Sequence, residues 1–214
     1  MASMPEAFRP LTAAELGLAE EITLRVSVAA GFRDEVTSTH ARRLSRYVEL
    51  LARLAGLPPE RCDLLRAAVP LYDLGKVGIP DVILLKPGRH TLEESEIMRQ
   101  HAEIGQRILG GSTSPLLELA ALVAFTHHER WDGTGYPRGM AGEAIPVEGR
   151  VVAVADAFNA ITSKRVYKAA FSPAKAAELL SDERGRQFDP RLLDLFLGAM
   201  AEVGAIRETH SDPE

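Results

Sequence analysis

Apolar residues recur at three- and four-residue spacing along most of the chain, a pattern that predicts amphipathic helices. The clearest stripe begins at His40 and ends at Gly56 and Pro58, which stop a helix. Capping-box sequences that begin at Thr12 and Thr91 predict two further helix starts. Other starts are expected at Pro59, Ser114, Glu148, Ser172 and Asp189. No period-two alternation is long enough for a sheet, so the sequence predicts an all-α fold in a single domain.

Two of these helices carry histidines at informative places. The helix that starts at Thr91 is expected to run unbroken to Gly110, with His101 in the middle of its apolar face. The helix that starts at Ser114 is expected to end at the pair His127-His128. Adjacent helical residues point about 100° apart, so both imidazoles face one centre only where a helix end meets that centre.

The composition is that of an ordinary globular protein, with 46% hydrophobic and 26% charged residues among 214. We expect an N-terminal extension and helix in residues 1–30, the functional domain in 31–207 and a flexible tail in 208–214. Apolar stretches are too short for a bilayer span and a signal peptide is not apparent, which predicts a cytoplasmic protein without membrane contact. The net charge of -5 argues against DNA or RNA binding, so any phosphate site must be local.

A set of polar residues is predicted to point inward or to lie at helix ends: His40, Asp73, Lys76, His101, His127, His128 and Asp156. Imidazoles and carboxylates are ligands that suit iron, manganese, zinc or nickel, and a carboxylate can bridge two ions. Each residue alone has a simpler explanation, because a single inward histidine is more often a satisfied core residue. Asp156, in an otherwise apolar helix, needs a metal, a proton or a charge partner such as Lys76. Together the residues favour a metal site.

A loop rich in glycine and proline follows the histidine pair, from Trp131 to Pro146. Trp131 and Tyr136 offer flat faces suited to a base or sugar, although the loop can also be packed by its own aromatic residues. Downstream, a basic cluster can neutralise phosphates or simply be a solvated surface; it comprises Lys164, Arg165 and Lys168.

Several of these strings occur in the order of a known family. The chain contains "YDLGKVGIPD", then "HHERWDGTGYP", then "FDP", and from about Arg33 to Phe196 it resembles the HD-GYP family of bacterial phosphodiesterases. The resemblance implies an all-α helical bundle of the HD type with a buried centre of two or three metal ions, commonly iron or manganese. It also implies hydrolysis of the bacterial second messenger cyclic di-GMP.

The resemblance further assigns roles to individual residues. The implied metal ligands are His40, Asp73, His101, His127, His128 and Asp156. Asp73 would bridge two ions, and Lys76 would hold a phosphate beside them. Arg165 and Lys168 would contact ligand phosphates. The Gly135-Tyr136-Pro137 segment would shape the pocket and contact partners such as a diguanylate cyclase.

Tyr72 is the departure that bears most on the metals, because the family has a ligating histidine there. One ligand set, Asp73 with three histidines, stays complete, whereas the other keeps only three protein ligands. Tyr72 either ligates as a phenolate or is a packed, hydrogen-bonding residue. Val36 replaces a glutamate of three-metal members, so we expect two ions and no third. Asn159 and Val166 also depart from the pattern, at an aspartate and a proline.

The leading hypothesis is a metal-dependent phosphodiesterase that opens cyclic di-GMP to a linear dinucleotide. Tyr72 is expected to reduce turnover more than ligand binding, because two ions are needed to activate the attacking water. One alternative is a non-catalytic module that binds cyclic di-GMP or docks a diguanylate cyclase through the Tyr136 loop. Another is a phosphohydrolase for a different nucleotide. A homodimer through the first helix is a further expectation.

Overall fold

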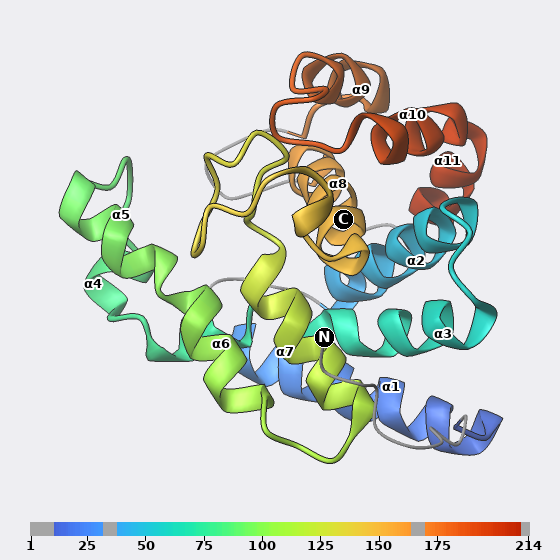
Figure 1. Ribbon diagram of the computed structural model, residues 1–214, viewed down its shortest axis with the longest axis horizontal. Helices are drawn as coiled ribbons and strands as arrows, with labels where there is room; N and C mark the ends of the chain where they lie inside the picture. Colours follow the sequence, from blue (N-terminus) through green and yellow to red (C-terminus); the bar gives the residue numbers. More distant parts are fainter. Residues whose placement is uncertain (1–10, 32–37, 164–169, 211–214) are drawn as a thin grey trace.

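The computed structural model describes residues 11–31, 38–163 and 170–210. Within these ranges the chain is a bundle of helices with two isolated β-bridges and no strands, which confirms the all-α prediction (Figure 1). The helices are α1 (Ala13–Ala30), α2 (Ser38–Leu54), α3 (Pro59–Ala68), α4 (Asp81–Leu84), α5 (Leu92–Arg99), α6 (His101–Leu109), α7 (Pro115–Thr126), α8 (Val147–Thr162), α9 (Pro173–Ser181), α10 (Pro190–Gly198) and α11 (Met200–Thr209). Short 3-10 turns are η2 (Val69–Leu71), η3 (Leu74–Gly78) and η4 (Gly142–Ala144). Val36, Arg165, Val166 and Lys168 lie outside the described residues.

Both predicted capping boxes are present, at Thr12 and Thr91. The prediction of one helix from Thr91 to Gly110 is wrong, because the chain bends at Gln100 and divides into α5 and α6. The Met98 carbonyl accepts a hydrogen bond from Nδ1 of His101 at 2.7 Å. The His101 side chain therefore hydrogen-bonds to the backbone just before the bend, and this bond fixes the position of its imidazole.

The last predicted helix also divides. Ala199, with φ -104° and ψ 26°, separates α10 from α11. α11 then runs to Thr209, so its last two residues lie in the predicted tail. α9, α10 and α11 gather at one end of the molecule, and α4 and α5 lie at the opposite side (Figure 1).

The hydrophobic core lies between α2, α3, α7 and α8. Three aromatic rings, of Tyr47, Phe158 and Phe196, meet edge to face at its centre with centroids 5.2–6.1 Å apart. All three side chains are fully buried. Such ring pairs add to the free energy gained by burial, so this cluster fixes α8 against α2 and α10.

The turn after α3 approaches α6 very closely. A Cβ atom on Gly75 would collide with the carbonyl oxygen of His101 and the backbone nitrogen of Gly105. Only glycine therefore fits at this crossing. The contact brings Asp73, which directly precedes η3, and Lys76, which lies within η3, against the first turn of α6.

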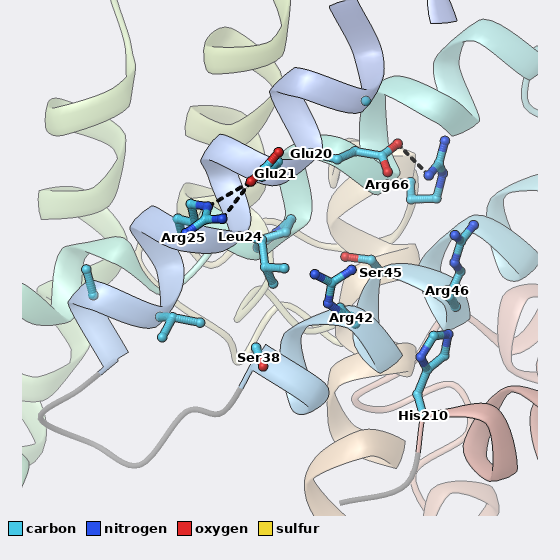
Figure 2. A pocket seen from close by; sticks show the side chains of 14 residues that line it. Glu20, Glu21, Leu24, Arg25, Ser38, Arg42, Ser45, Arg46, Arg66 and His210 are labelled. Carbon is cyan, nitrogen blue, oxygen red and sulfur yellow. Dashed lines mark hydrogen bonds and ion pairs between the residues drawn. The ribbon is translucent and has the colours of Figure 1, made fainter. Parts of the chain in front are cut away.

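A groove with a volume of about 1000 Å³ lies elsewhere, between α1 and α2 (Figure 2). Ion pairs of α1 form one side, including Glu20 with Arg66, while Arg42 and Arg46 of α2 lie on the other. None of the predicted metal ligands lines it. Among the described helices, none is both long and apolar enough for a membrane span.

We predict that Gly75→Ala lowers the free energy of unfolding by about 1–3 kcal/mol, because the added methyl group must displace the backbone of α6. Urea unfolding followed by circular dichroism measures the change. Gly17→Ala is the matched control, since Gly17 lies in α1 with nothing within 4 Å of the added carbon. This control should be neutral or stabilising by about 0.5–1 kcal/mol. Equal stabilities of the two variants would refute the close crossing.

Candidate metal centre

Four of the predicted ligands converge at one point. One ligand atom from each of Asp73, His101, His127 and His128 lies within 4.8 Å of every other. Asp73 comes from the turn between η2 and η3, His101 is the first residue of α6, and the histidine pair ends α7. The helix end thus brings both adjacent imidazoles to one centre, as the sequence predicted.

Two of the imidazoles are oriented by hydrogen bonds to backbone carbonyls of earlier residues. Nδ1 of His101 donates to the Met98 carbonyl at 2.7 Å, and Nδ1 of His127 donates to the Val123 carbonyl at 3.0 Å. A carbonyl only accepts, so the proton of each neutral ring lies on Nδ1 and the lone pair lies on Nε2. These Nε2 atoms face each other at 3.5 Å. Two lone pairs pointed at one centre are the arrangement that a metal ion requires.

Asp73 completes the set. Its Oδ1 is buried without a hydrogen-bond donor among the described residues, 3.4 Å from Nε2 of His101 and 3.7 Å from Nε2 of His127. Its other oxygen, Oδ2, pairs with Nζ of Lys76 at 2.7 Å. Oδ1 and both nitrogens are acceptors, and a buried acceptor without a donor is costly. A cation fits this position, so the residues present suit a metal ion.

The charge states also suit metal binding. Burial lowers the pKa of His101 and His127, and burial together with His127 lowers the pKa of His128 to about 2. Burial alone would raise the pKa of Asp73, but Lys76, His101 and His127 together outweigh it and hold that pKa below the usual range. The histidines are therefore uncharged and Asp73 is ionised at neutral pH. Asp73 and the histidines consequently form no ion pairs, despite their short distances.

Tyr72 lies beside this set as a hydrogen-bond donor. Its hydroxyl donates to Oδ1 of Asp156 at 2.8 Å, and its ring meets the His127 ring edge to face at 5.0 Å. Burial, and then the charge of Asp156, raises the pKa of the phenol well above its usual value. The protonated hydroxyl supplies the partner that buried Asp156 needs. The structure therefore places Tyr72 in its hydrogen-bonding role.

His40 and Asp156, the other two predicted ligands, lie outside the four-ligand cluster. Nδ2 of Asn159 is 3.1 Å from Nε2 of His40 and 3.3 Å from its Nδ1. The Asn159 Oδ1 accepts from Nε of Arg43 at 2.7 Å, and Arg43 also donates to Ser163 at 2.6 Å. Arg43 is a residue that sequence reasoning missed, although an arginine on the inward side of a helix signals a buried partner.

The predicted loop closes over the centre through Tyr136. The Tyr136 ring stacks on His128 with centroids 4.7 Å apart. The guanidinium of Arg99 lies 5.2 Å from the centroid of the same Tyr136 ring. Trp131 points elsewhere, with Arg150 5.7 Å from its ring. Of the two aromatic residues that the sequence singled out, only Tyr136 contacts a metal ligand.

Glu129 anchors this loop and was also missed. Its carboxylate is buried and accepts from the backbone nitrogens of Arg138 at 2.7 Å and Met140 at 2.9 Å. At the other end of the turn, a Cβ atom on Gly135 would meet the backbone of His128 to Arg130. The charged residue directly after the histidine pair was the available signal for this anchor.

Comparison with known proteins agrees with this geometry. A family model described as "HD domain" matches residues 8–192. The "Cyclic di-GMP phosphodiesterase response regulator RpfG" of Xanthomonas campestris pv. campestris (strain 8004) is 44% identical over 186 residues, which is 87% of this chain and 49% of that protein. The "3'3'-cGAMP-specific phosphodiesterase 2" of Vibrio cholerae serotype O1 (strain ATCC 39315 / El Tor Inaba N16961) is 41% identical over 193 residues, which is 90% of this chain and 37% of that protein.

A solved structure also shares the fold. The crystal structure of a V. cholerae cyclic GMP-AMP specific phosphodiesterase (V-cGAP3) aligns with a TM-score of 0.66 at 17% identity, covering 91% of this chain and 51% of that one. The chain thus spans about half or less of the length of these relatives. By its matching residues, its motifs and its fold, the chain belongs to the HD domain family, in the HD-GYP branch that its motifs indicate.

Proposed function

We propose that this chain hydrolyses a phosphodiester bond of cyclic di-GMP in a metal-dependent reaction and releases a linear dinucleotide. The observation that carries the proposal is Oδ1 of Asp73, buried between the lone pairs of His101 and His127 with no proton to share. A relative that is 44% identical and is named a cyclic di-GMP phosphodiesterase supports the substrate class.

A metal ion in this set supplies activation of the attacking water and stabilisation of charge on the phosphate. Iron or manganese suits the mixture of imidazole and carboxylate ligands. Lys76, whose side chain is 27% exposed and lies 2.7 Å from Asp73, can neutralise a substrate phosphate at the rim. The family resemblance implies two ions.

Tyr136 forms the wall of the proposed substrate site. Its ring lies parallel to His128 within 28° and extends the flat surface over the ligands, which suits stacking of a guanine base. Arg165 and Lys168 are proposed to hold the ligand phosphates, and they lie outside the described residues. A cytoplasmic location and a homodimer through the first helix stay predictions.

A second candidate function has its own support. The hydrogen bond from Tyr72 to Asp156 occupies a carboxylate that two-metal hydrolysis needs, which favours a module that binds cyclic di-GMP without rapid turnover. In that case the Gly135-Tyr136-Pro137 segment would be the docking site for a diguanylate cyclase. A third candidate, hydrolysis of another nucleotide, is favoured by the relative named as specific for 3'3'-cGAMP.

We predict that the wild-type chain cleaves cyclic di-GMP faster than 3'3'-cGAMP and that Asp73→Asn lowers this turnover by at least about 100-fold, because the negative charge of a metal ligand is lost. Product formation is measured by chromatography with added iron, added manganese and no added metal. Asp194→Asn is the control, since it removes a carboxylate from an exposed ion pair far along the sequence.

Three outcomes of this assay are distinct. Equal turnover by wild type and Asp73→Asn would remove the metal centre from the reaction. Binding of cyclic di-GMP without turnover would establish the module instead. Preferential cleavage of 3'3'-cGAMP would move the substrate to the third candidate.

We predict that, after metal has been removed with a chelator, the free energy of unfolding of the protein falls as pH is lowered from 7 towards 4.5. His128 has a folded pKa of about 2, whereas the unfolded chain takes up this proton near pH 6.5. Stability is therefore full above pH 6.5 and declines below it, by up to about 1.4 kcal/mol per pH unit for this histidine. Urea unfolding at several pH values should show a smaller slope for His128→Asn. An unchanged slope would contradict the uncharged state of this ligand.

A further inference from the structure

The predicted metal ligands fall into two groups with different surroundings. Asp73 and the three histidines of the cluster point bare acceptor atoms at one centre. His40 and Asp156, in contrast, lie outside that cluster, and each has a donor side chain against it. Those two donors, Tyr72 and Asn159, are both residues at which this chain departs from the family pattern.

Tyr72 occupies Asp156 by direct contact. The hydroxyl lies 2.8 Å from Oδ1, and the tyrosine side chain is 8% exposed, so water does not compete for this hydrogen bond. The phenol reaches from the turn that carries Asp73 to the middle of α8. Its ring is fixed against His127, which leaves little room for it to swing away.

The Asn159 side chain lies against the His40 ring, and Arg43 fixes the orientation of the Asn159 amide. A guanidinium has no acceptor, so the amide oxygen must face Arg43, from whose Nε it accepts at 2.7 Å. The amide NH2 then faces His40, within 3.1–3.3 Å of both ring nitrogens. Whichever nitrogen carries the lone pair has an N–H group beside it. An aspartate at position 159 would instead present an acceptor to the ring.

We propose that Tyr72 and Asn159 close the second metal position, so that the chain binds one metal ion tightly, at Asp73, His101, His127 and His128. A second ion would have to displace two buried hydrogen bonds, and it would find no imidazole at position 72 in exchange. Changes of this kind around a metal ligand alter affinity by about 10- to 100-fold. This inference rests on the proposed metal centre and replaces the two-ion expectation, but it does not depend on turnover.

The test is metal stoichiometry. Wild type, Tyr72→Phe, Tyr72→His and Asn159→Asp are stripped with chelator and titrated with Mn²⁺, and bound metal per chain is measured by elemental analysis after desalting. Electron paramagnetic resonance separates isolated Mn²⁺ from a coupled pair. Wild type should hold one isolated ion. Tyr72→His should take up a second, coupled ion at least about 10-fold more tightly than wild type does.

The other variants separate the two parts of the mechanism. Tyr72→Phe removes the donor without adding a ligand, and Asn159→Asp removes the amide donor, so each should tighten the second ion by less than Tyr72→His. Tyr47→Phe is the matched control, because it deletes a buried phenolic oxygen in the core between α2, α8 and α10 and should keep one ion.

Five results decide between the claims. Two equally tight ions in wild type, or one ion in Tyr72→His, would overturn the closure of the second position. An unchanged second-ion affinity in both Tyr72→Phe and Asn159→Asp would also overturn it. Wild type that binds no Mn²⁺ at all would instead overturn the metal centre itself. Absence of cyclic di-GMP turnover with one bound ion would overturn only the proposed reaction.

Discussion

The metal centre depends on buried acceptor atoms that have no hydrogen to share. Nε2 of His101, Nε2 of His127 and Oδ1 of Asp73 lie within 3.7 Å of one another. Leaving a buried acceptor without a donor costs about 1–3 kcal/mol. The fold can keep them together because Nδ1 of each imidazole donates to a backbone carbonyl, that of Met98 in α5 for His101 and that of Val123 in α7 for His127. A cation bound there would remove that cost and would thereby stabilise the folded chain.

The same constraint explains why the surrounding backbone is so tightly fitted. Gly75 lets the Asp73 turn lie directly on α6, and Gly135 lets the loop lie directly on the residues after His128. Glu129 then holds the far side of that loop through two backbone nitrogens. These contacts fix ligands from different elements without any side chain between them. A site built in this way tolerates little movement, which suits the ångström-scale placement that metal ligands require.

Local sequence patterns were enough for most helix starts and for the four residues that cluster at one point. Capping boxes located Thr12 and Thr91, and adjacent histidines at a helix end implied a common centre. The break at Gln100 was not predictable from periodicity, because the apolar spacing continues across it while the His101 side chain takes a backbone acceptor. The separation of α10 from α11 was likewise not predictable, because it occurs at Ala199 and not at a glycine.

The sequence also did not show which buried polar side chains pair with one another. Tyr72 and Asp156 are 84 positions apart, and Arg43 and Asn159 are 116 apart. Nothing in the local pattern indicates which distant donor meets which acceptor. The sequence could state only that Asp156 needs a partner, and it offered Lys76, which instead pairs with Asp73. Which buried charges neutralise one another is set by how the helices pack, and packing is known only once the fold is assembled.

The residue that replaces the family histidine is therefore constrained by Asp156. A buried carboxylate in α8 must keep a partner, and an aliphatic side chain at position 72 would leave it with none from this turn. Tyrosine keeps that carboxylate satisfied with a hydroxyl hydrogen bond in place of a metal bond. This hydrogen bond joins the middle of α8 to the turn that carries Asp73, so the packing of these two elements depends on a donor at position 72.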